Sequence, residues 1–134
     1  MNITRFEDLE IWQMSLENTK VIYDLSAKER FSKDFGLRDQ IRRAVISISS
    51  NIVEGFEKRN NNEFCRFLRI SKGSIGEVRN QLHIALSVGY ISQSEFDSTN
   101  NTLEILAKRV GGLISYLEEQ KRQKLVTRNS SLKN

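Results

Sequence analysis

The sequence contains no proline and a single cysteine among its 134 residues. Because proline interrupts helices and marks turns, its absence favours long, unbroken helices. Cys65 alone cannot form a disulfide within the chain, which is typical of a reducing compartment. No stretch approaches the roughly 20 apolar residues of a membrane span, and Glu7 and Asp8 stand where a secretion signal needs an apolar run. We therefore expect a cytoplasmic protein.

Groups that carry catalysis or bind metals are scarce. His83 is the only histidine, so a metal motif with two histidines is impossible. Cys65, next to Phe64 and Phe67, is typical of a small buried hydrophobe and has no obvious activating base. We therefore predict that the protein is not an enzyme and uses no cofactor or metal. A catalytic role for His83 or Glu54 is the weakest alternative.

Two further features invite a functional interpretation. The sequence GSIGE at Gly73–Glu77 resembles a phosphate loop, but it lacks the Lys-Ser/Thr ending and follows no strand. Inside a helical pattern, its small residues indicate instead the close approach of another helix. Glu54 lies in the apolar run NIVEGF, and we interpret it as a buried or interfacial acid paired with Arg42 or Arg43. The close-approach interpretation also applies to the other glycines of helical segments: Gly55, Gly111 and Gly112.

Apolar residues recur at three- and four-residue spacing in four segments, which predicts four helices. Residues that favour helix ends occur at the expected places. The predicted helices cover about 4–28, 37–57, 61–88 and 93–120. The predicted end signals are the capping boxes Thr4-x-x-Glu7 and Ser92-x-x-Glu95, an N-cap at Asn60 and a left-handed C-terminal cap at Gly89.

Four long helices with short connections pack most simply as an antiparallel up-down-up-down bundle. We therefore predict an all-α fold with one domain, residues 1–120, followed by a polar and basic tail, residues 121–134, that is disordered.

The first two predicted helices are apolar on more than one side. In the first helix, an inner stripe through Leu9, Leu16 and Tyr23 leaves other aliphatic residues on the opposite side. An exposed apolar surface of this kind marks an interface, so we predict a homo-oligomer. Scattered surface aliphatics are the alternative. The predicted interface residues are Ile11, Ile22 and Leu25 on the first helix and Ile46 and Val53 on the second.

Positive charge is unevenly distributed. Residues 121–134 carry five bases and no acid, whereas the rest of the chain has 16 bases and 17 acids. Within that remainder, residues 38–79 have nine bases and five acids, and such a surface could hold the phosphates of a nucleic acid. A solvated helix face is the alternative. The predicted nucleic-acid-binding residues are Arg38, Arg42, Arg43, Lys58, Arg59, Arg66, Arg69, Lys72 and Arg79.

Three blocks of the sequence, in order and with matching spacing, resemble one bacterial family. It is the four-helix-bundle family encoded in intervening sequences of 23S rRNA genes, which includes the accessory variability determinant of diversity-generating retroelements. The blocks are RFEDLEIWQMS (5–15), FGLRDQIRRAVISISSNIVEGFEKR (35–59) and EFCRFLRISKGSIGEVRNQLHIALSVGYI (63–91).

The resemblance implies a four-helix bundle that assembles as a homopentamer with a basic surface. For the retroelement relatives it implies binding of a reverse transcriptase and its RNA. The residues that resemble the family by position, and that the resemblance assigns mostly to packing and assembly, are Gln40, Arg42, Arg43, Ser47, Asn51, Glu54, Gly55, Phe64, Phe67, Gly73, Ser74, Glu77 and Leu82.

Two functions follow from these observations. The first is a non-catalytic, oligomeric protein that binds RNA or assists ribonucleoprotein assembly, through the basic residues named above and the tail. The second is a structural scaffold that docks a protein partner without binding nucleic acid. A salt titration of RNA binding separates them, because binding to phosphates weakens with salt.

Overall fold

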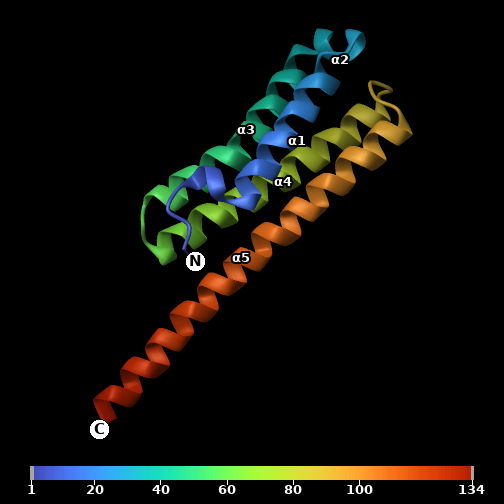
Figure 1. The fold of residues 1–134 in the computed structure, drawn as a ribbon. Coiled ribbons are helices and arrows are strands. Elements are labelled where there is room, and N and C mark those ends of the chain that lie inside the picture. Colours follow the sequence, from blue (N-terminus) through green and yellow to red (C-terminus); the bar gives the residue numbers. More distant parts are fainter. Residues whose placement is uncertain (1, 134) are drawn as a thin grey trace.

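The computed structural model describes residues 2–133, and within them every regular element is a helix. A short 3-10 helix, η1, precedes five α-helices. Four of these are long, and the fifth, α2, is a single short turn of helix between the first two long ones (Figure 1). The bounds are η1 Phe6–Asp8, α1 Glu10–Ser26, α2 Glu29–Lys33, α3 Phe35–Glu57, α4 Asn61–Ser87 and α5 Gln93–Lys133.

The four long helices enclose one hydrophobic core. Helix α1 packs against α3 and α5, and α4 packs against the same two helices, so the four form a closed bundle. The short connections 58–60 and 88–92 reverse the chain direction, as predicted for antiparallel helices. The fully buried large side chains are Ile22, Phe31, Ile41, Val45, Ile48, Ile52, Leu68, Ile75, Val78, Leu82, Leu103 and Leu106.

Helices α3 and α4 make the most extensive contact in the bundle. A Cβ atom added at Gly55 would lie 2.7 Å from the Cβ atom of Phe67, so only glycine fits there. Farther along the pair, the Ser71 hydroxyl donates to the Ile48 carbonyl oxygen (2.8 Å), and the hydroxyls of Ser47 and Ser74 lie 2.9 Å apart. The predicted close approach at Gly55 is therefore confirmed. Among the other predicted glycines, an added Cβ at Gly111 would lie 3.4 Å from Lys72 Nζ, and at Gly73, Gly76 and Gly112 it would meet no atom within 4 Å.

Most predicted helix ends are confirmed. Asn60 accepts a hydrogen bond from the Glu63 amide (3.1 Å) at the start of α4. Ser92 and Glu95 form a reciprocal capping box at the start of α5, with distances of 2.8 and 3.1 Å. Gly89 has a φ of 82°, in the left-handed region expected after α4.

The predicted capping box at Thr4 and Glu7 is wrong. Residues 6–8 form η1, and α1 begins only at Glu10, after Leu9 in an extended conformation. The Glu7 side chain pairs with Arg5 instead. The side chain of Gln13 then donates to the Glu7 carbonyl oxygen (2.9 Å), which ties η1 to the start of α1.

The prediction of which face of α1 is buried was also wrong. Ile11, Ile22 and Leu25 are buried within the subunit, whereas Leu16 and Tyr23 of the predicted inner stripe are exposed. The prediction failed because the buried face contains Ser15, Asn18 and Ser26, whose polar groups are hydrogen-bonded within the subunit. These three isoleucine and leucine side chains are therefore not available to contact a second copy of the chain.

Helix α5 does not end at residue 120. It continues to Lys133 and projects beyond the bundle, as Figure 1 shows in red. The structure therefore differs from the predicted disordered tail over residues 121–133. Residues 118–125, EEQKRQKL, are helix formers without glycine or proline, and Arg122 pairs with Glu119 one turn earlier (2.7 Å).

Candidate nucleic-acid interface

The nine predicted nucleic-acid-binding residues do not form one surface. Arg38 and Arg42 lie on the side of α3 that faces α1 and α2, where Arg42 donates to the Ser26 hydroxyl (2.8 Å). Arg69 and Arg79 instead lie on the side of α4 that faces α5. Four of the nine are also paired with carboxylates of the same chain: Arg38 with Asp39, Arg66 with Glu63, Arg69 with Glu118, and Arg79 with Glu104.

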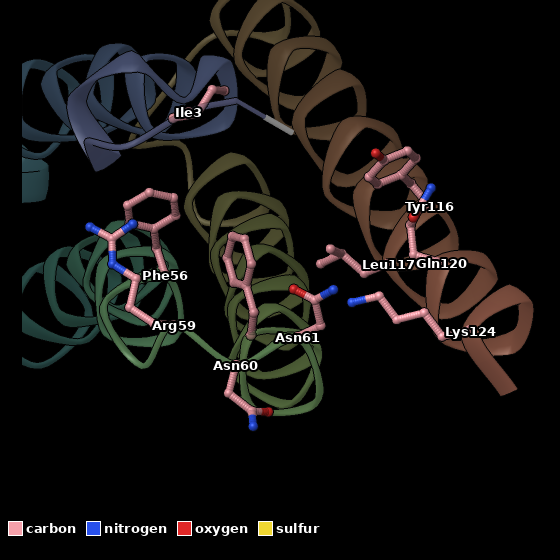
Figure 2. Close-up of a pocket in the computed structure, with 10 residues that line it drawn as sticks. Ile3, Phe56, Arg59, Asn60, Asn61, Tyr116, Leu117, Gln120 and Lys124 are labelled. Atoms are coloured by element: carbon pink, nitrogen blue, oxygen red, sulfur yellow. The ribbon is translucent and has the colours of Figure 1, made fainter. Parts of the chain in front are cut away.

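Basic residues gather instead at the end of the bundle from which α5 projects. The α3–α4 turn and the first exposed turns of α5 lie side by side there and enclose adjoining hollows of about 320 and 260 Å³. We call this region the basic cleft, and Figure 2 shows the larger hollow. The basic and asparagine residues that line the basic cleft are Arg59, Asn60, Asn61, Asn62, Lys121, Lys124 and Arg128, and the rest of the lining is Gln120 with Ile3, Phe56, Phe64, Tyr116, Leu117 and Leu125.

One wall of the basic cleft is held by Arg59. Its φ of 53° is left-handed, and this conformation turns the chain from α3 into α4. The guanidinium donates to the Thr4 carbonyl oxygen (2.8 Å) and lies over the Phe56 ring, 4.6 Å from its centre. Arg59 therefore holds a positive charge at the edge of the cleft, and no carboxylate of residues 2–131 forms an ion pair with it.

The floor of the basic cleft is the N-terminus of α4. The Asn60 side chain caps the Glu63 amide, whereas the amides of Asn61 and Asn62 precede the first intrahelical hydrogen bond. Helix N-termini carry partial positive charge. The Asn61 and Asn62 side chains line the hollows and can donate hydrogen bonds to an anion.

The second wall is the projecting part of α5. Lys121, Lys124 and Arg128 line the cleft, and none of them is paired with a carboxylate among the described residues. Arg122, by contrast, forms hydrogen bonds to Glu119 and so lowers the pKa of that carboxyl. Sequence reasoning missed this wall because it treated residues 121–134 as disordered. The signal was present, since positions 121, 124 and 128 share one face if the helix continues.

Other candidate residues lie outside this site. His83 packs against Phe96, with ring centres 4.6 Å apart, and Cys65 is buried. Glu54 is exposed, and within the described part of the subunit it forms no ion pair with Arg42 or Arg43, contrary to the prediction. Among residues 2–133, no group of three or more acidic, histidine or cysteine side chains could hold a metal ion. In the same range, no helix is long and apolar enough to cross a bilayer.

Fold and site together define an all-α helical bundle with a basic cleft at one end. Residues 7–112 match the 23S rRNA-intervening sequence protein family, so the chain belongs to that family. The match ends before the projecting part of α5. The resemblance found in the sequence is thereby confirmed at the level of the family, whereas membership of its retroelement branch stays a prediction.

Among solved structures, the chain is similar to a protein of unknown function from the S23 ribosomal protein family of Bacteroides thetaiotaomicron VPI-5482. The two share 26% sequence identity, and the match covers 78% of this chain and 97% of that protein, with a TM-score of 0.71. No curated protein matches the sequence.

Proposed function

We propose that this protein is a non-catalytic, self-associating RNA-binding protein that holds the RNA phosphate backbone in the basic cleft. The observation that supports the proposal is the alignment of Lys121, Lys124 and Arg128, all unpaired, opposite the α4 N-terminus and Arg59. Unpaired cations around a hollow bind phosphates by charge and by release of counterions. Paired arginines on the bundle sides do so less well, because their charge is already compensated.

The shape of the site favours a polymer of phosphates over a single anion. Lys121 and Arg128 are seven residues apart on a helix, which is a rise of about 10 Å. Successive phosphates of one strand advance by about 3.4 Å along a duplex, so this distance corresponds to about three phosphates. RNA is the favoured polymer because the family is named for an intervening sequence of 23S rRNA. A reverse transcriptase or other ribonucleoprotein partner would reach the protein through such an RNA.

The proposal predicts that a triple variant, Lys121→Gln, Lys124→Gln and Arg128→Gln, binds a structured RNA hairpin about 10–100-fold more weakly. Each lost phosphate contact also reduces the slope of log affinity against log salt by about 1, so the slope should fall by about 3. Fluorescence anisotropy over a salt series measures both quantities. A DNA hairpin of the same sequence, measured in parallel, tests the preference for RNA.

A matched control separates local from general charge effects. The variant Arg30→Gln, Lys72→Gln, Lys108→Gln removes the same charge from exposed sites on α2, α4 and α5, outside the basic cleft, and none of these three pairs with a carboxylate among the described residues. It should bind RNA nearly as well as the original chain. If the two triple variants bind equally, the basic cleft is not the site.

A second candidate function is the docking of a protein partner on the projecting helix. The observation in its favour is the exposure of Leu125 and Val126, which are 49% and 56% exposed. RNA binding that is absent near physiological salt, or that does not change with salt, would contradict the first function and leave the second.

A further inference from the structure

One side of the bundle, formed by α3 and α4 away from the basic cleft, carries unpaired charges, an unpaired buried amide oxygen and exposed isoleucines. We call it the α3–α4 flank. A hollow of about 320 Å³ lies between the two helices there, and the same two helices expose three isoleucines. The hollow is lined by Gln40, Arg43, Ala44, Ser47, Ser74, Glu77 and Gln81, and the exposed isoleucines are Ile46, Ile70 and Ile84.

Gln81, which lines this hollow, has a side-chain oxygen without a hydrogen-bond donor among the described residues. The residue is only 8% exposed, and this oxygen is buried. A buried acceptor without a partner costs about 1–3 kcal/mol. Because the Gln81 side chain lines the hollow, a turn of its amide towards a donor that enters from outside the subunit would remove this cost.

The charges on the rim are opposite and unpaired. Arg43 on α3 and Glu77 on α4 both line the hollow, and neither forms an ion pair among the described residues. A surface with one unpaired charge of each sign is complementary to the same surface on a second copy of the chain. Glu77 also makes the flank unsuitable for RNA, because a carboxylate repels phosphate.

Exposed isoleucines lie on the same two helices as the unpaired charges. Ile70, Glu77 and Ile84 are seven residues apart and therefore form a line on α4, and both isoleucines are 43% exposed. Ile46, on the adjoining side of α3, is also 43% exposed. Between them, Gly73 has no atom within 4 Å of its added Cβ, which leaves the helix backbone open to close contact. Exposed apolar side chains near the charged groups supply surface that association would remove from water.

We infer that the α3–α4 flank is the surface through which copies of this chain associate. Arg43 of one copy pairs with Glu77 of the next, and a donor of the second copy reaches the Gln81 oxygen. This inference rests on the self-association in the proposed function and assigns it to one face. It keeps Ile46 as an interface residue, does not include the half-buried Val53, and replaces Ile11, Ile22 and Leu25, which are buried inside the subunit.

Charge reversal tests the inference. Arg43→Glu and Glu77→Arg, each alone, should raise the dissociation constant of the assembly at least tenfold, because like charges then meet at the contact. The double variant should return it to within about threefold of the original value. Sedimentation velocity and light scattering, without RNA, measure the mass across a dilution series, and circular dichroism verifies that each variant is folded. Lys108→Glu, on the surface of α5, is the control and should leave the mass unchanged.

The outcomes are distinguishable. An original chain that is monomeric at micromolar concentration would overturn self-association, and the inference with it. An assembly that persists in both single variants would overturn the inference alone. Gln81→Leu gives an independent result: the inference predicts a weaker assembly, whereas a more stable subunit with unchanged assembly would show that no second copy supplies a donor.

Discussion

Single residues determine how closely α3 and α4 pack. Gly55 permits the contact with Phe67, and the serines farther along supply hydrogen bonds in place of bulk. The sequence indicated that Gly55 serves a close approach. It did not reveal that Gly73 and Gly76, which occur in a similar helical context to Gly55, face outward. The reason is that a glycine by itself does not indicate which side of its helix packs against a neighbour.

Gly55→Ala should therefore destabilise the protein. The new methyl group would lie 2.7 Å from the Phe67 Cβ atom, and overpacking of this kind costs about 1–3 kcal/mol. Gly112→Ala is the control, since its added Cβ meets nothing within 4 Å; alanine favours the helix there by about 0.5–1 kcal/mol. Urea unfolding followed by circular dichroism measures both changes. Equal effects of the two substitutions would contradict the packing described here.

Polar residues explain why the buried face of α1 was assigned wrongly. Periodicity places the largest hydrophobic residues inside, yet α1 buries Ser15 and Asn18 and exposes Leu16. Asn18 accepts a hydrogen bond from Thr102 of α5 (2.8 Å), and its amide donates to the Met14 carbonyl oxygen (2.9 Å). The Met14 partner lies one turn away in α1 itself, whereas the Thr102 partner comes from the tertiary structure and cannot be read from the sequence of α1 alone.

At the level of helices, the connection between α4 and α5 was predicted almost completely. Gly89 and the Ser92–Glu95 capping box were both recognised from the sequence, because helix ends have local signals. The structure adds Lys28, from before α2, which forms an ion pair with Glu95. That pair, across the end of the bundle, depends on the fold and could not be read from local sequence.

The ionised Glu95 side chain should make the free energy of unfolding depend on pH. Hydrogen bonds from the Lys28 ammonium and then from the Ser92 amide lower the pKa of Glu95 below its usual value of 4.5. A lowered pKa in the folded state means that the stabilisation is present above about pH 4.5 and is lost as the pH falls through the folded-state pKa. Glu95→Gln keeps the capping-box hydrogen bond but loses the charge that faces Lys28 and the helix N-terminus, so it should cost about 0.3–1 kcal/mol at pH 7 and much less at pH 3.

Unfolding by urea at the two pH values measures this difference. Glu17→Gln is the control, because Glu17 is exposed on α1 and no ion pair joins it to another described residue. A Glu95→Gln variant whose deficit is the same at pH 3 as at pH 7 would show that ionised Glu95 contributes nothing at this helix end.

At the level of the whole molecule, the closed bundle could be predicted and the site could not. Four amphipathic segments with short connections allow few arrangements, so the sequence was sufficient for the fold. The basic cleft depends on how far α5 continues and on which turn lies beside it (Figure 1). Charge counting gave residues 38–79 the leading role, because it could not show that carboxylates from distant segments, such as Glu104 and Glu118, already pair with those arginines.

Hydrogen–deuterium exchange with and without the RNA hairpin tests the central claim most directly, because it locates the contact on the chain. An isolated stretch of helix is marginally stable, so the projecting part of α5 should exchange rapidly in the free protein. We predict that RNA slows exchange in residues 58–63 and 117–131 and leaves residues 36–46 and 66–79 unchanged. Protection confined to 36–46 or 66–79, or no protection anywhere, would contradict the assignment of RNA binding to the basic cleft.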